Sequence, residues 1–173
     1  YSSLFSDLDE VSANLNQVIQ SHDNSEVILV GHSLGGLVIR RWASLYKAKH
    51  LRAAVTLGTP HQGAKIVRTL EKIKLHHLTG VNKRLLAENR EFLNEDKTSF
   101  PIVTVSGVAN WGYYLPFGVF FDGHSDGSVR ECEAHLPWSF QRHQVDSSHS
   151  FLMHNKKTLK IIRNFLHQLP VTS

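Results

Sequence analysis

The sequence has few of the features that mark several classes of protein. Its only cysteine is Cys132, so no disulfide forms within the chain, and the redox compartment stays open. Basic residues number 19 against 15 acidic ones, and no basic stripe is interleaved with aromatic residues, which argues against a nucleic-acid partner. No apolar run approaches the roughly 18 residues that a membrane-spanning helix needs. A membrane-spanning protein and a nucleic-acid-binding protein are therefore disfavoured.

Apolar residues recur at helical spacing in some segments and form short strand-like runs in others, and the two kinds of segment alternate along the chain. With 41% hydrophobic residues in 173, the chain is long enough for one domain with a core. The predicted elements, in chain order, are a helix at 3–21, a strand at 26–30, a helix from 34, a strand at 53–57, helices within 64–99, a strand at 100–107, a strand at 143–149 and a helix at 159–169. This alternation predicts an α/β fold, with a mainly parallel sheet covered by helices on both faces. The strand at 26–30 is expected to be buried on both faces.

The segment VGHSLGG, residues 30–36, joins the first predicted strand to the next helix. It matches the pattern G-x-S-x-G, in which a strained turn holds a nucleophilic serine above the sheet. We interpret Gly31 and Gly35 as positions where a side chain would collide with the neighbouring strand and helix. The helix that begins near Leu34 directs its free N–H groups at the site, where they can stabilise an oxyanion. The alternative interpretation is a tight turn in which Ser33 is only structural.

Three further segments follow the serine in an informative order. They are VTLGTPHQG (55–63), SDGSV (125–129) and SSHSFLMHN (147–155). With the VGHSLGG segment, they resemble the α/β-hydrolase lipases and esterases, in particular bacterial triacylglycerol lipases and inositol-deacylase-like lipases. LLAENREFLNE (85–95) is similar to the lid-region helix of those enzymes. The resemblance covers nearly the whole chain in the family's order, which is serine, acid, histidine.

The resemblance implies a role for four residues. Ser33 would be the nucleophile, Leu34 N–H an oxyanion donor, Asp126 the acid and His149 the base. This agrees with the chemistry, because a serine hydroxyl is a poor nucleophile until an imidazole takes its proton and a carboxylate fixes the tautomer of that imidazole. The implied reaction is carboxylic ester hydrolysis through an acyl-enzyme, and it needs no cofactor. Acyl transfer or thioester cleavage on the same residues is an alternative, as is a non-catalytic module that binds a lipid or a protein.

Twelve histidines leave the identity of the base open on the residues alone. His149 follows a short strand and precedes the last helix, where the base has to lie. His154 is a rival that we expect to cap a helix or face solvent. His32 is expected to pack beside the turn with its ring directed away from the serine hydroxyl. His61 is interpreted either as a loop residue or as part of the substrate pocket.

Rival residues are also compared for the acid and for a possible metal site. Asp126 lies on a glycine-flanked loop after the third strand, with Asp122 as its nearest rival. Asp146 is too close in sequence to His149 to reach its far nitrogen easily. The adjacent His76 and His77, and His124 with Asp126, are pairs without a third ligand at zinc-like spacing, so we predict no metal site.

The chain is interpreted as one domain, residues 1–173, with a helical lid-like insert at about 64–99. The resemblance implies that the insert covers an acyl pocket and that the substrate is a small ester or lipid; an ordinary crossover helix is the alternative for the insert. The aromatic residues between Trp111 and Phe121 are interpreted either as part of the core or as another wall of that pocket. The lid would also make transient contact with a membrane surface. Only 32 residues precede Ser33, and they contain no His-Gly loop of the kind that supplies a second oxyanion donor. We therefore expect that amino-terminal strands of the fold are missing from this chain, as in a processed product or a fragment.

Overall fold

The computed structural model describes the chain except for residues 1–2, 23–24, 48–49, 64–97, 110–122 and 171–173. The described elements are α1 (Ser3–Gln20), β1 (Val27–His32), α2 (Leu34–Leu45), β2 (Leu51–Leu57), β3 (Ile102–Gly107), α6 (Glu131–Ala134), β4 (Gln141–Val145), the 3-10 helix η4 (His149–His154) and α7 (Lys156–Gln168). The predicted lid-like insert lies almost entirely outside the described residues. The aromatic segment from Trp111 to Phe121 also lies outside them.

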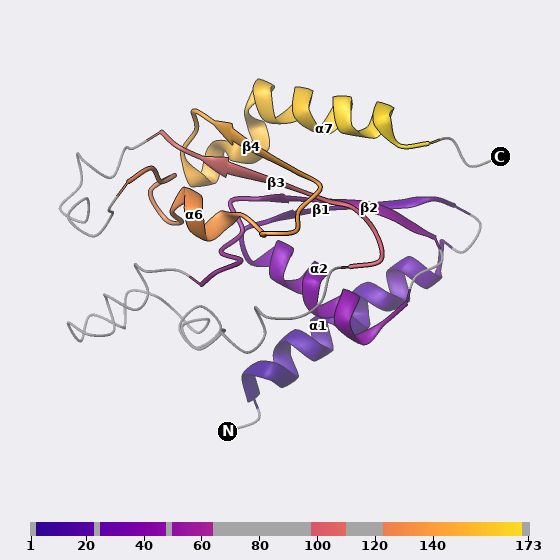
Figure 1. The fold of residues 1–173 in the computed structure, drawn as a ribbon. Coiled ribbons are helices and arrows are strands. Elements are labelled where there is room, and N and C mark those ends of the chain that lie inside the picture. Colours follow the sequence, from indigo (N-terminus) through magenta and orange to yellow (C-terminus); the bar gives the residue numbers. More distant parts are fainter. Residues whose placement is uncertain (1–2, 23–24, 48–49, 64–97, 110–122, 171–173) are drawn as a thin grey trace.

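The four described strands form one parallel sheet in the order β1-β2-β3-β4. The register pairs His32 with Leu57 and Gly107 with Val145, so that all four strands end at the same edge. We call this edge the carboxyl edge of the sheet. Helices α1 and α2 lie on one face and α7 lies on the other (Figure 1). The predicted α/β fold with helices on both faces is confirmed.

Each face of the sheet is covered by its own apolar cluster. The cluster beneath α1 and α2 contains the buried residues Ile19, Ile39, Trp42, Leu51, Ala54, Phe100, Ile102 and Leu136. The cluster beneath α7 contains the buried residues Ala53, Val55, Leu57, Val103, Val105, Val145, Leu152 and Phe165. From Ala53 onward in β2, and throughout β3, alternate residues therefore point to opposite faces, as the pleat of a strand requires. Because both faces are covered, nearly every residue of β2 and β3 is buried.

The first strand differs from its prediction. We expected burial on both faces, yet the Val30 side chain is 52% exposed and only Gly31 in β1 is buried. The physical reason is position, because β1 is the edge strand of the described sheet and has β2 on one side only. The apolar sequence VILV predicts a strand correctly but does not distinguish an edge strand from a central one. α6 was also not predicted, since four residues are too few to show a helical period.

The described helices also bear on membrane insertion. Among the residues that the structure describes, no helix combines the length and the apolar character needed to cross a bilayer.

Trp42 is the largest side chain of the α2 face and anchors that helix to the sheet. It is 1% exposed, lies against Tyr46 and Phe100, and donates a hydrogen bond from Nε1 to Asn16 Oδ1 at 3.2 Å. We expect Trp42→Ala to lower the free energy of unfolding by about 3–5 kcal/mol, because it leaves a cavity and an unpaired amide. Urea unfolding followed by circular dichroism measures the change. Leu45→Ala is the matched control on the same helix; Leu45 is 44% exposed, and a loss as large as that of Trp42→Ala would contradict this account.

Candidate active site

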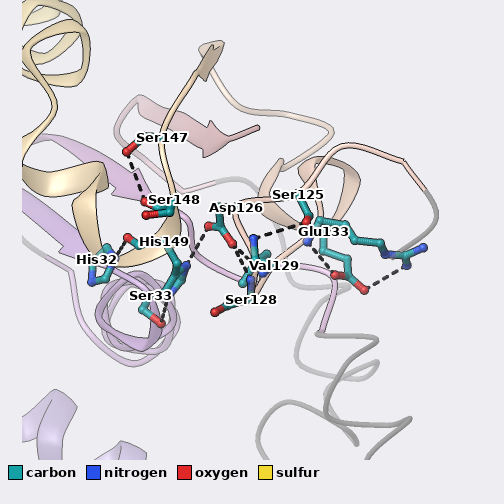
Figure 2. Close-up of polar contacts among 12 residues, drawn as sticks. His32, Ser33, Ser125, Asp126, Ser128, Val129, Glu133, Ser147, Ser148 and His149 are labelled. Carbon is teal, nitrogen blue, oxygen red and sulfur yellow. Dashed lines mark hydrogen bonds and ion pairs between the residues drawn. The ribbon is translucent and has the colours of Figure 1, made fainter. Parts of the chain in front are cut away.

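Three polar side chains meet at the carboxyl edge of the sheet (Figure 2). Ser33 follows β1, Asp126 lies in the loop that precedes α6, and His149 begins η4 after β4. His149 Nε2 lies 3.0 Å from Ser33 Oγ, and His149 Nδ1 lies 2.7 Å from Asp126 Oδ2. The structure therefore brings together the serine, the acid and the histidine that the sequence singled out. Their side chains form one continuous hydrogen-bonded chain.

The backbone at Ser33 is strained in the way that the elbow pattern predicts. Its φ of 54° and ψ of −123° make it the only non-glycine residue with positive φ in the described chain. Such a conformation costs about 1–3 kcal/mol and persists only where the surroundings enforce it. The N–H of Ser33 donates to the carbonyl of Leu57 at 2.9 Å, which extends the β1–β2 ladder into the turn. The turn is thus fixed by the sheet on one side and by α2 on the other.

The glycines around Ser33 have unequal roles. A Cβ added at Gly31 would lie 2.7 Å from backbone atoms of Gly35 and Gly36, so the predicted steric need is real there. Gly35 differs from its prediction, because a Cβ at that position meets nothing within 4 Å. The crowded position is Gly36, whose Cβ would lie 2.1 Å from Thr59 Oγ1. Steric crowding therefore does not require a glycine at position 35, the second glycine of the pattern. It does require one at the neighbouring position, Gly36.

The hydrogen bonds fix which nitrogen of His149 carries a proton. Carboxylate oxygens only accept, so Nδ1, which faces Asp126 Oδ2, must be the N–H donor. In the neutral ring Nε2 is then an acceptor, and the hydroxyl of Ser33 donates to it. This tautomer is the one in which the imidazole can take a proton from the serine.

The carboxylate of Asp126 is buried and fully engaged. Its side chain is 1% exposed, and Oδ1 accepts from the backbone N–H of Ser128 at 2.9 Å and of Val129 at 2.7 Å. The carboxylate therefore folds back onto its own loop, and Oδ2 is directed at His149. The backbone repeats the contact, since the N–H of His149 donates to the carbonyl of Asp126 at 2.9 Å. Asp126 thus binds His149 through both its carboxylate and its backbone carbonyl.

Two further features of the site are the backbone N–H of Leu34 and the arrangement of side chains that could bind a metal ion. Leu34 is the first residue of α2, and the first N–H groups of a helix have no acceptor within it. Among the described residues, no group of three or more His, Cys, Asp or Glu side chains is arranged to hold a metal ion.

The rival residues lie elsewhere or outside the described chain. His154 is exposed at the end of η4, and the helix cap beside it is Asn155, whose side chain accepts from the N–H of Lys157. Asp146 is exposed and does not face the ring of His149; its carbonyl accepts from Asn155. Asp122, His76 and His77 are among the residues that the structure does not describe.

His61 lies in the interior and not on an open pocket wall. It is fully buried, and Nε2 lies 2.9 Å from Thr56 Oγ1 on the α2 face of the sheet. Burial first, then the charge of Arg40 and the presence of His135, lower the pKa of His61 well below 6.5. This burial favours the structural one of its two interpretations. His135 is built into the same face, with Nδ1 2.6 Å from Thr104 Oγ1.

Two residues make contacts with His149 that the sequence did not predict. Gly58 has φ of +55°, and a Cβ there would lie 2.9 Å from Asp126 Oδ2 and 3.1 Å from His149 Nδ1. It is the first residue after β2, which is the only signal that could have singled it out. His32 is the second, because its ring nitrogen contacts the main chain of His149 at 2.9 Å.

The crowding at Gly58 gives a test of stability. Gly58→Ala should lower the free energy of unfolding by about 1–3 kcal/mol, because the methyl group meets the Asp126–His149 pair. Gly123→Ala is the matched control, since Gly123 has a more demanding φ of +93° but open space around it. Urea unfolding compares the two. An equal or smaller loss for Gly58→Ala would show that the site tolerates the methyl group.

Burial of neutral His61 gives a test of pH dependence. An unfolded histidine takes up a proton near pH 6.5, whereas the lowered pKa of His61 keeps it neutral in the fold. The unfolded chain therefore binds more protons as the pH falls below about 6.5, and stability decreases in that direction. We expect the urea midpoint to fall between about pH 7.5 and 5.5, and to fall less steeply in His61→Asn. Thr56→Val, which keeps the titrating ring, should retain the wild-type slope; equal slopes in all three proteins would contradict the prediction.

Comparison with known proteins identifies the fold. A sequence profile for the alpha/beta hydrolase fold matches residues 6–104, more than half of the chain. The triacylglycerol lipases of Pseudarthrobacter phenanthrenivorans and Burkholderia plantarii are each 32% identical over 80 residues, or 46% of this chain. Those residues cover 24% and 22% of the two lipases, so the chain spans about a quarter of the length of the curated relatives that it matches.

Solved structures show the same architecture. The mature lipase of Bacillus licheniformis matches with a TM-score of 0.70 at 22% identity, over 90% of this chain and 71% of the lipase. A metagenomic carboxyl esterase matches with a TM-score of 0.68 at 15% identity, over 82% of this chain and 50% of the esterase. At these identities the likeness establishes the fold. Together with the profile match, it shows that the chain belongs to the alpha/beta hydrolase fold family.

Proposed function

We propose that this chain carries the reacting residues of a carboxylic ester hydrolase of the lipase and esterase type. The observation that supports this most is the hydrogen-bonded chain from Ser33 Oγ through His149 to Asp126. A structural role alone does not account for a strained serine backbone, a histidine in the accepting tautomer and a buried carboxylate at one sheet edge. These three features are the ones that nucleophilic catalysis by serine requires.

The acylation step follows from the positions of these atoms. Ser33 Oγ attacks the carbonyl carbon of the ester while its proton passes to His149 Nε2, which lies 3.0 Å away. The imidazolium that forms is stabilised by Asp126 Oδ2 at Nδ1. The negative charge that develops on the carbonyl oxygen is held by the N–H of Leu34, at the positive end of the α2 dipole.

The tetrahedral intermediate formed in this way collapses when the bond between the carbonyl carbon and the alcohol oxygen breaks. His149 Nε2 returns its proton to that oxygen, the alcohol leaves, and an acyl group remains on Ser33. Water then enters, His149 removes a proton from it, and the hydroxide attacks the acyl carbon. The bond between that carbon and Ser33 Oγ breaks, His149 returns the proton to Oγ, and the acid leaves. No step needs a cofactor, because the chain's own hydroxyl, imidazole and carboxylate move all the protons.

The substrate class is proposed from the relatives and from the insert. Two relatives are named triacylglycerol lipases, and one structural neighbour is named a carboxyl esterase. We therefore propose that the substrate is a small-molecule ester or a lipid. The insert at about 64–99 would form the lid over its acyl chain and would contact a membrane surface transiently.

Covalent labelling tests the nucleophile. The full-length protein should react with a fluorophosphonate probe and hydrolyse p-nitrophenyl esters, and Ser33→Ala should lose labelling and at least about a thousandfold in kcat. Ser44→Ala is the matched control, because Ser44 is an exposed serine on α2. A panel of p-nitrophenyl esters of increasing chain length then compares short and long acyl groups.

Two results would contradict the proposal. A folded wild-type protein that is neither labelled nor active would favour a non-catalytic module that binds a lipid or a protein. Labelling that persists in Ser33→Ala would assign the nucleophile to another residue. Where the enzyme is active, product analysis in the presence of an added alcohol or thiol separates hydrolysis from acyl transfer on the same residues.

A further inference from the structure

The side chain of His32 contacts the main chain of His149. Its Nε2 lies 2.9 Å from the carbonyl oxygen of His149, a residue 117 positions later in the chain. The two rings also pack, with centroids 4.8 Å apart and an interplanar angle of 45°. In Figure 2, His32 and Ser33 are each joined to His149 by a dashed line.

The contact shows which ring nitrogen of His32 carries a hydrogen. A carbonyl oxygen can only accept, so Nε2 of His32 must carry the hydrogen and donate it. Because the main chain of His149 receives the bond, His32 does not compete for either ring nitrogen of that residue. Both ring nitrogens of His149 are thus left to Asp126 and Ser33.

Four polar atoms of His149 are each held by a named partner. Asp126 holds two of them, the backbone N–H at 2.9 Å and Nδ1 at 2.7 Å. The serine turn holds the other two, Nε2 through Ser33 at 3.0 Å and the carbonyl oxygen through His32 at 2.9 Å. The residue before the serine therefore fixes the backbone of His149, while the serine itself faces the ring. His149 is also the first residue of η4, where the chain turns away from the sheet.

We propose that His32 is a positioning residue, which sets the distance between the His149 ring and Ser33 Oγ by anchoring the His149 carbonyl to the serine turn. This inference rests on the proposed function, because it assigns a role in a proton transfer between those two residues. Proton transfer depends steeply on distance, and a displacement of about 1 Å can cost up to about a hundredfold in rate. Without the anchor, the described hydrogen bonds that hold His149 at the site are those to Asp126 and to Ser33.

Three substitutions separate the hydrogen bond from packing. Gln matches the reach of histidine Nε2 with its amide nitrogen, so His32→Gln retains a donor at the same place. Asn reaches only as far as Nδ1, so His32→Asn has a donor in the wrong place. His32→Phe keeps a ring against His149 and has no donor. His22→Phe is the matched control, since His22 is exposed beyond the end of α1.

The measurement is kcat and KM for p-nitrophenyl butyrate, together with the rate of fluorophosphonate labelling. We expect kcat and the labelling rate to fall about tenfold in His32→Asn and His32→Phe, with KM within about twofold, since a single hydrogen bond is lost and the ring shifts. His32→Gln should stay within about threefold of wild type, and His22→Phe should equal it. Circular dichroism and thermal melts confirm that each variant is folded; where His32→Phe does not fold, the Gln and Asn variants decide.

Two outcomes would overturn the inference. Wild-type kcat in all the His32 variants would show that the anchor is dispensable, and an equal loss in Gln and Asn would assign His32 to packing only. Failure of the proposed function looks different, because the wild-type protein itself would then neither hydrolyse esters nor take up the probe.

Discussion

The parallel register of the four strands is the constraint on which the site depends. Ser33 and His149 are 116 residues apart, and Asp126 lies 23 residues before His149, so no local structure can hold the three together. Because every strand ends at the same edge, the segments that follow β1, β3 and β4 converge there. The apolar clusters on both faces fix the strands, and through them the spacing of the side chains. The packing of the sheet therefore determines where the three reacting side chains lie.

The local backbone then orients the groups that the sheet brings together. The elbow holds Ser33 at positive φ, an unfavourable conformation that neighbouring ladder bonds and tight glycine contacts enforce. Asp126 is fixed by backbone N–H groups of its own turn, and His149 is fixed by Asp126 on one side and by His32 on the other. Since each polar atom of His149 has a defined partner, the ring is oriented before any substrate binds, and preorganisation of this kind lowers the barrier of a charged step.

Much of this arrangement is predictable from sequence, and the exceptions have physical reasons. The order of strands and helices follows from apolar periodicity. Ser33 follows from its turn pattern, and Asp126 and His149 follow from the resemblance of their segments, in order, to those of a known family. The contact of His32 was missed because it joins residues 117 positions apart, a distance that no local pattern encodes. The exposure of Val30 was missed because an edge strand and a central strand share the same apolar pattern. Gly35 was assigned a steric need that belongs to Gly36, because crowding depends on Thr59 in another segment. The lid remains a prediction, since its residues lie outside those described.

The most direct test of the central claim is a crystal structure of the full-length protein after reaction with a fluorophosphonate. We expect electron density continuous from Ser33 Oγ to phosphorus, with the phosphoryl oxygen at the N–H of Leu34. His149 should lie between the adduct and Asp126, with the bond to the carboxylate intact. Density for the adduct on any other residue, or an unmodified Ser33 beside a displaced His149, would contradict the account.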